Sequence, residues 1–238
     1  MAKASKIIEY VLSQVGYQEG AKNWNKYADD IDNNHPLWYG SCGKKQNLDW
    51  CSVFVDDAFI QAYGVSEAHR LLNRPDNNLG AVVKYAYNYL DKIGRTGKTP
   101  KLGATVYFQN NKGLCHTGIV VDFTNDYVWT VEGNAGSGSQ YVVKNKYNRI
   151  ATYIYGYGYP DYEAEPVPDH YKRDGIYTVT CKGPLRLRTG PNTTDEILLD
   201  LSKGDKVHCL KVVKSGGKTW LRVDGYCCAV EDGNVYIE

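Results

Sequence analysis

Cys51 has the position in this sequence that best suits a nucleophile. It opens an apolar run with helical spacing, which we expect to form a helix with Asp49 as its N-cap and Gly64 as its stop. Unsatisfied backbone N–H groups and the positive end of the helix dipole favour a thiolate at such a place. Cys51 also lies on the apolar stripe of this helix, where a free cysteine often only fills the core. The helix alone therefore leaves a catalytic and a packing role equally open.

His116 is the candidate base for this cysteine. It begins the first of two predicted strands that a turn near Asn125 joins into a hairpin. In a hairpin centred there, His116 lies across from Asn134, with Glu132 two residues back on the same face. A carboxylate and a carboxamide beside an imidazole orient the ring and fix its tautomer. A lone surface histidine would explain this pair poorly, so the set predicts cysteine–histidine nucleophilic chemistry.

The remaining cysteines and histidines have no comparable partners in the sequence. Seven cysteines at irregular spacing, without a C-x-x-C pair, favour a reduced compartment and leave at least one thiol unpaired. Cys115 directly precedes His116, so we expect its side chain on the opposite side of the strand, in the core. Cys42 is also expected to be buried. Structural or surface roles are expected for His35, His69, His170 and His208.

Helices precede strands in the first 160 residues. Helical periodicity predicts helices at 8–15, with Ser5 as N-cap, at 49–64 and at 79–90. The β-rich runs that follow lie at 104–109, 117–123, 127–132 and 151–159. This order predicts an α+β domain in which N-terminal helices pack on an antiparallel sheet.

A proline-rich acidic stretch divides the chain. Residues 161–175 contain Pro166 and Pro168 among polar residues with little to bury, which is typical of a linker. Residues 1–160 then form one domain. Residues 176–238 form a second, in which short apolar runs between glycine-containing turns predict a small all-β barrel.

The charge balance and the N-terminus exclude several classes of function. Lys plus Arg number 28 and Asp plus Glu 27, without a basic cluster, so nucleic acid is not an expected partner. The first 20 residues are amphipathic, unlike a signal peptide, and no stretch is apolar enough for membrane insertion. We therefore expect the protein to stay in the cytoplasm that makes it until something else releases it.

Three blocks of the first domain, Asp49–Val55, His116–Val120 and Val131–Asn134, follow one another in a helix-then-hairpin context. Together they resemble the cysteine, histidine-dependent amidohydrolase/peptidase (CHAP) family. The similarity extends to a closing run at Ile154–Pro160 and covers nearly the whole first domain. The resemblance implies a papain-like α+β fold.

The resemblance also implies roles for individual residues. Cys51 would be the nucleophile and His116 the general base and then the acid. Glu132 and Asn134 would orient and polarise the imidazole. The backbone N–H of Cys51 is the expected oxyanion donor, and Trp50 beside it is a candidate for substrate contact.

The segment 29–48, before the nucleophile, looks like an insertion. Its acidic and amide residues suggest calcium, because some CHAP domains bind calcium upstream of the cysteine; they are Asp29, Asp30, Asp32, Asn33 and Asn34. Their spacing lacks the mid-loop glycine and terminal glutamate of an EF-hand. We therefore expect a solvated acidic loop, no metal site and no cofactor, with calcium as the alternative.

The second domain resembles the bacterial SH3-like domain. The similarity lies in Leu185–Asn192, Leu201–Val207 and Thr219–Val223, whereas the final segment departs from the family pattern. The resemblance implies binding to cell-wall peptide or glycan, with Trp220 and Tyr226 as candidate contacts. A packing or dimerising domain is the alternative.

Together these features predict a peptidoglycan hydrolase of the endolysin type, from a phage or prophage, that cleaves an amide bond of the bacterial cell wall. The bond is either that between N-acetylmuramic acid and L-alanine, which makes an amidase, or one within the peptides, which makes an endopeptidase. Release from the cytoplasm to the wall would depend on a partner holin. The alternatives are a non-catalytic wall-binding or tail-associated protein, a secreted-type autolysin of the host, and a cytosolic thiol peptidase. The oligomeric state stays open.

Overall fold

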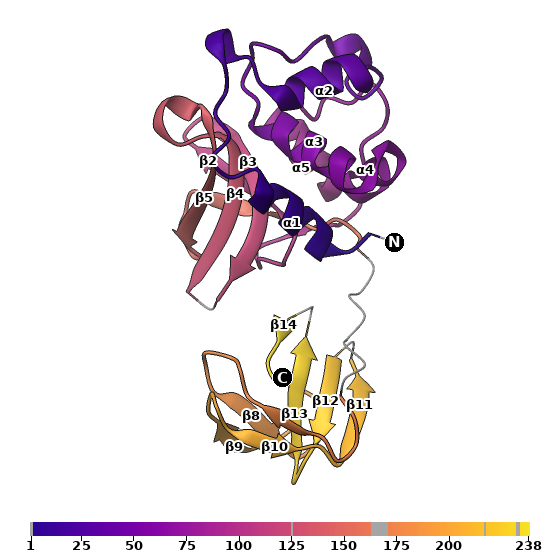
Figure 1. Ribbon diagram of the computed structural model, residues 1–238, viewed down its shortest axis with the longest axis vertical. Helices are drawn as coiled ribbons and strands as arrows, with labels where there is room; N and C mark the ends of the chain where they lie inside the picture. The colour runs from indigo at the N-terminus through magenta and orange to yellow at the C-terminus, as the bar shows by residue number, and fades with distance from the viewer. Residues whose placement is uncertain (1, 125, 163–170, 217, 232–233) are drawn as a thin grey trace. The chain divides into compact units, whose positions relative to one another are not determined.

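The computed structural model describes residues 2–124, 126–162, 171–216, 218–231 and 234–238. The chain divides into two compact units, Met1–Glu163 and Ala164–Glu238 (Figure 1). The boundary between them falls within 161–175, the range predicted as a linker. Residues 163–170 of that range, His170 among them, lie outside the described residues.

The first unit consists of helices followed by one antiparallel sheet. Its α-helices are α1 (Ala4–Ser13), α2 (Lys26–Asn34), α3 (Cys51–Tyr63), α4 (Val65–Leu72) and α5 (Val83–Asp91). Its strands are β1 (Thr96–Gly97), β2 (Thr105–Asn110), β3 (Gly113–Phe123), β4 (Tyr127–Ala135), β5 (Tyr141–Asn148) and β6 (Ile154–Gly158), in the order β1-β6-β2-β3-β4-β5. The predicted α+β class is confirmed. Among the described residues, no helix is long and apolar enough to cross a membrane.

The sheet of the first unit buries apolar side chains on both faces. Ile119, Val131 and Val142 pack with the helices, which gather on one side of the sheet in Figure 1. Val120 of β3, next to Ile119, and Val128 of β4, three residues before Val131, point the other way and belong to a separate cluster on the second face. This alternation places Glu132 on the second face, because it follows Val131.

Helix α3 is the central helix of the first unit, and it is buried on almost all sides. Gly64 ends it with φ of 83°, as predicted. The residue in the N-cap position is Trp50, so the prediction of Asp49 as cap is wrong. The Asp49 carboxylate instead accepts a hydrogen bond from Asn134 Nδ2 at 3.3 Å. Ser5 is likewise not a cap, because α1 begins one residue before it and has Lys3 in that position.

The acidic segment before Cys51 is partly helical, which corrects the prediction of a solvated loop. Helix α2 spans Lys26–Asn34, and Asn25 caps it by accepting from the Ala28 backbone N–H at 2.8 Å. Tyr27, Ala28 and Ile31 bury one face of α2 against the core. The described residues contain no group of three or more His, Cys, Asp or Glu side chains that could hold a metal ion.

The second unit contains only strands and irregular segments among its described residues. Its strands are β7 (Ile176–Thr178), β8 (Leu185–Arg188), β9 (Ile197–Leu201), β10 (Lys206–His208), β11 (Lys211–Ser215), β12 (Lys218–Arg222), β13 (Tyr226–Glu231) and β14 (Asn234–Val235). One sheet runs β11-β12-β13-β8-β9, with β14 beside β13, and β7 pairs with β10. Val179, Leu187, Leu221 and Ala229 belong to its separate apolar core.

Candidate active site

Cys51 is the first residue of α3, as the sequence predicts, and its side chain reaches the edge of the core. The residue is 5% exposed and packs with Val83 and Ala86 of α5 and with Tyr107 of β2. As the first residue of the helix, its backbone N–H has no partner within the helix. The thiol therefore combines near-complete burial with the electrostatic environment of a helix N-terminus.

His116 and Glu132 meet across the β3–β4 hairpin. Ile119 pairs with Val131, as in a hairpin centred at residue 125. His116 Nε2 lies 3.0 Å from Glu132 Oε2. Gly118 makes this contact possible, because a Cβ atom there would approach Cγ of Glu132 to 2.5 Å. The hairpin thus brings the imidazole to a carboxylate that the sequence placed beside it.

His116 is held in its charged form. Burial by itself would lower the pKa of the imidazole. Side-chain hydrogen bonds to Cys51 and Glu132, and the negative charges of both groups, outweigh burial and raise the pKa to about 10. At neutral pH the ring is therefore an imidazolium whose partners are the side chains of Cys51 and Glu132. This pairing is that of an activated cysteine nucleophile.

The Glu132 carboxylate has further donors that sequence reasoning missed. Its Oε2 accepts from Asn145 Nδ2 and from the Tyr147 hydroxyl, each at 3.1 Å, and its Oε1 accepts from the Thr130 hydroxyl. Asn145 and Tyr147 belong to β5, a strand that the sequence reading omitted. The alternation of Val143, Asn145 and Tyr147 with Lys144 and Lys146 was the available signal for a strand there.

Asn134 does not join His116. It lies at the end of β4 with φ of 54°, and its Nδ2 donates to Asp49 Oδ1 at 3.3 Å. Among the described residues, no hydrogen bond connects Asn134 to the imidazole. The residue therefore ties β4 to the segment that leads into α3, and Glu132 is the group that orients His116.

Trp50 is a packing residue, contrary to the prediction that it contacts substrate. Its side chain is fully buried, stacks on Tyr27 at 5.5 Å and donates from Nε1 to Glu19 Oε2 at 2.6 Å. Gly133 of β4 lies against its ring, where a Cβ atom would come within 2.6 Å. A ring enclosed in this way fixes the start of α3 and has no surface left for a ligand.

Cys115 is exposed, which corrects the prediction that it points into the core. Phe108 pairs with His116 and Gln109 with Leu114, so Cys115 is the extra residue of a β-bulge. A bulge interrupts the regular alternation on which the prediction relied. Burial, followed by the charge of nearby Cys51, raises the pKa of the Cys115 thiol and so disfavours its thiolate form. Cys42 is half-buried, and all seven cysteines are free thiols.

The candidate wall-binding residues of the second unit differ in exposure. Trp220 is 1% exposed and packed, so it cannot be the surface contact that was predicted. Tyr226 is half-buried at the start of β13. Among the described residues of this unit, five large apolar side chains are exposed: Ile197, Leu198 and Leu199 on the edge strand β9, together with Ile176 and Leu210. Cys227, the residue after Tyr226 along β13, belongs to the apolar core of this unit.

The other described histidines have structural partners. His69 stacks on Trp38 at 4.4 Å, and His35 lies 3.3 Å from the Asp30 carboxylate. His208 in the second unit lies 3.7 Å from Asp174. These contacts agree with the structural or surface roles expected for them.

Comparisons with known proteins add little to this geometry. No family model and no curated protein matches the chain. Two solved structures match 99% of this chain and 97% of their own at 18% identity: "The crystal structure of Ly7917", with a TM-score of 0.39, and "The crystal structure of Ly7917 with the hydrolyzing product of MDP", with a TM-score of 0.32. At such TM-scores the likeness supports no conclusion about the fold or the activity of this chain.

Proposed function

We propose that this chain is a peptidoglycan hydrolase of the CHAP type that cleaves an amide bond with Cys51 as nucleophile. The supporting observation is the contact of His116 with Glu132 at 3.0 Å, next to a cysteine at the first turn of a helix. The resemblance of the sequence blocks around these three residues to the CHAP family supplies the substrate class. By the same resemblance, the first unit is a papain-like catalytic domain.

The reaction begins with attack of the Cys51 thiolate on an amide carbonyl carbon. The new C–S bond converts the carbonyl oxygen into an oxyanion, to which the Cys51 backbone N–H donates. His116 gives its proton to the leaving nitrogen, the C–N bond breaks and a thioester remains. His116, now neutral, takes a proton from water, whose oxygen attacks the thioester and releases the acid and the Cys51 thiolate.

Glu132 stabilises the imidazolium in both resting and reacting enzyme. Because the carboxylate is buried, its attraction to His116 is screened little by solvent. It also fixes the orientation of the ring, so that Nδ1, the imidazole nitrogen not bound to Glu132, is available to interact with Cys51. This division of roles is that of an orienting carboxylate in a catalytic triad.

The second unit is proposed to be an SH3-like domain that binds the cell wall. The supporting features are the sequence blocks at 185–192, 201–207 and 219–223 and the all-β arrangement of the described residues. The proposed origin is a phage or prophage endolysin that reaches peptidoglycan from the bacterial cytoplasm after a holin opens the membrane. Amidase and endopeptidase activities are both compatible with the site.

Zymography on purified cell walls tests this proposal. We expect a clearing zone for the full chain, none for Cys51→Ala, and an undiminished zone for the matched control Cys42→Ser. Mass spectrometry of the released muropeptides then identifies the bond. New amino termini at L-alanine indicate an amidase, and any other new terminus indicates an endopeptidase. Full clearing by Cys51→Ala would contradict the assignment, and wall binding without clearing by the unchanged chain would favour a non-catalytic binding protein.

A further inference from the structure

The strand β5 lies at the edge of the sheet and supplies two side chains to the buried carboxylate beside His116. We propose that Tyr147, assisted by Asn145, is a positioning residue that keeps Glu132 ionised and directed at His116, and thereby sets the acid limit of catalysis. The inference rests on the proposed function for its catalytic consequence. Both residues contact the Glu132 carboxylate, through which they would act on His116.

The geometry around Glu132 leaves little freedom for its side chain. The residue is 1% exposed, and Oε2 receives hydrogen bonds from His116 at 3.0 Å and from Asn145 and Tyr147 at 3.1 Å each. A buried carboxylate loses its hydration, and hydrogen-bond donors must replace it if the charged form is to persist. Two of the three donors to the oxygen that faces His116 come from β5.

Tyr147 remains a donor over the whole pH range of the reaction. Burial, and then the negative charge of Glu132, raise the pKa of its hydroxyl well above the ordinary value. Its ring is fixed by Phe108 at 5.0 Å, and Phe108 also lies 5.7 Å from the His116 ring. Tyr147 and His116 therefore both lie next to the Phe108 ring and converge on one carboxylate oxygen.

The titratable groups that face Glu132 are few. They are His116 on β3 and Tyr147 on β5, with Cys51 of α3 acting through His116. The lysines of β5 alternate to the other face, where Lys146 lies over the Tyr127 ring at 3.8 Å. No cation among these described neighbours other than the imidazolium compensates the carboxylate, so the neutral donors on β5 carry the rest of its stabilisation.

Removing the Tyr147 hydroxyl should make the carboxylate easier to protonate. A protonated Glu132 no longer attracts the imidazolium. As the solution is acidified, the variant should therefore lose activity at a higher pH than the unchanged chain. A hydrogen bond to a charged group corresponds to about one pH unit, or about a tenfold change in equilibrium. Tyr147→Phe should move the acid limb of kcat upward by about one unit and leave KM nearly unchanged. Asn145→Ala should shift it in the same direction.

The test combines the pH profile of wall hydrolysis with the NMR titration of the His116 ring in the full chain. Tyr141→Phe is the matched control, because it removes a hydroxyl from the same strand without touching Glu132. The His116 resonance is assigned by its absence in His116→Ala. We expect its acid-side inflection to move to higher pH in Tyr147→Phe and Asn145→Ala. In Tyr141→Phe the inflection should stay at the same pH. Unchanged inflections in both folded variants would overturn the inference. Because the titration needs no substrate, it stands or falls separately from the hydrolase assignment, which Cys51→Ala tests.

Discussion

The interiors of the two units differ in polarity. The described residues of the first unit bury eleven polar or charged side chains: Asn25, Lys45, Ser52, Asp56, Asp57, Arg74, Asn78, Thr105, Thr117, Thr130 and Glu132. Those of the second unit bury two, Arg188 and Thr219. Buried polar groups cost free energy unless they are paired, so a fold retains them where they position something. The difference agrees with the proposal that the first unit carries the chemistry, whereas the described core of the second unit is almost entirely apolar.

Several of these polar residues support the start of α3 or the helix itself. Ser52, the neighbour of Cys51, donates to the Gly80 carbonyl at 2.5 Å. One turn further, Asp56 pairs with buried Arg74 and accepts from Trp38 Nε1 at 2.9 Å. These buried contacts fix α3 to the segments that surround it. They make the orientation of Cys51 depend on the whole first unit.

Loss of the nucleophile or its base should have the largest effect. Cys51→Ala and His116→Ala should each lower wall hydrolysis by at least about a thousandfold, because the two residues act as one unit. Glu132→Gln should be milder, since it leaves a base in place. Turbidity assays on cell walls measure the loss. If the two units have separate roles, the same variants should bind walls as the unchanged chain does. A pull-down with insoluble peptidoglycan measures this binding.

Separation of the units should have the next largest effect. A chain that ends near Tyr162 should cleave soluble muropeptides at the turnover of the full chain. On intact cells it should be weaker by about ten- to a hundredfold, because binding by the second unit raises the local concentration of enzyme. A fluorescent fusion of residues 171–238 should bind walls by itself. Equal lysis by the short and full chains would show that the second unit packs or dimerises instead.

Alkaline pH should remove the imidazolium and with it the reaction. Since the pKa of His116 is raised to about 10, activity should fall about tenfold per unit above that pH. The same shift makes a contribution to stability that is fully present below about 6.5, the unfolded value, and is lost as pH rises through about 10. Rate profiles and thermal melts between pH 6 and 11 measure both. A rate that is constant through pH 11 would contradict a protonated His116 in the working enzyme.

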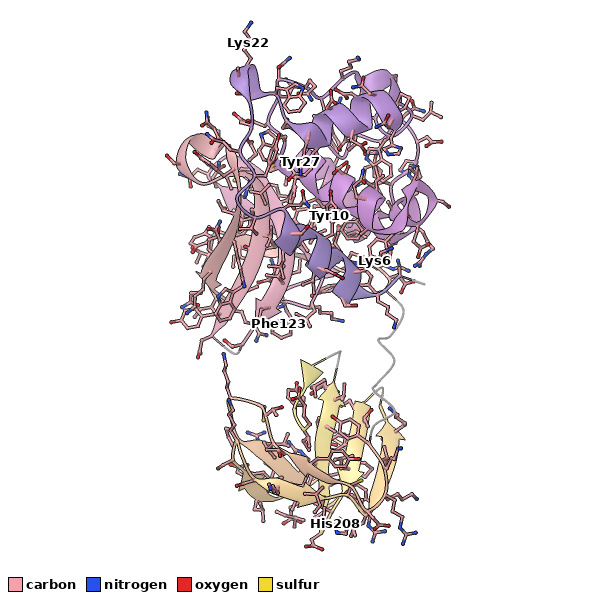
Figure 2. The ribbon with its side chains drawn as sticks, in the orientation of Figure 1. Lys6, Tyr10, Lys22, Tyr27, Phe123 and His208 are labelled. Carbon is pink, nitrogen blue, oxygen red and sulfur yellow. The ribbon has the colours of Figure 1, made fainter. Side chains whose placement is uncertain are left out.

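The smallest predicted effect concerns Asp57, a buried carboxyl of α3 outside the active site. Tyr10, labelled in Figure 2, donates to it at 3.5 Å. Burial and then the charge of Asp30 raise its pKa to about 8. The folded state therefore holds this proton more tightly than the unfolded state, and stability falls as pH rises from about 4 through about 8.

Asp57→Asn should remove this pH dependence. We expect the variant to melt at a higher temperature than the unchanged chain at pH 9, by about 2–4 °C for each kcal/mol gained. The two should differ little at about pH 3, where the carboxyl is largely protonated in both states. Calorimetry at the two pH values gives the comparison. Asp195→Asn in the second unit is the control. If Asp57→Asn changed the melting temperature only at low pH, the raised pKa assigned to Asp57 would be contradicted.

The sequence alone determined the features that depend on short-range regularities. Helical spacing from Cys51 to the stop at Gly64 placed the thiol at a helix start, because backbone hydrogen bonding within one segment decides where a helix begins. A turn near residue 125 predicted that His116 and Glu132 lie close together, and they do, although a register shift between Val120 and Asp122 interrupts the pairing of the hairpin. Both are properties of a single contiguous stretch of chain.

Only the tertiary structure decided the features that join distant segments. It gave Glu132 its donors on β5, turned Asn134 toward Asp49 and enclosed Trp50 between Tyr27 and Gly133. It also exposed Cys115, because the bulge arises from the pairing of β3 with β2 and leaves no trace in the alternation of β3 itself. Burial and strand pairing are set by which segments meet in space. The local sequence around a residue does not determine which distant segments it meets.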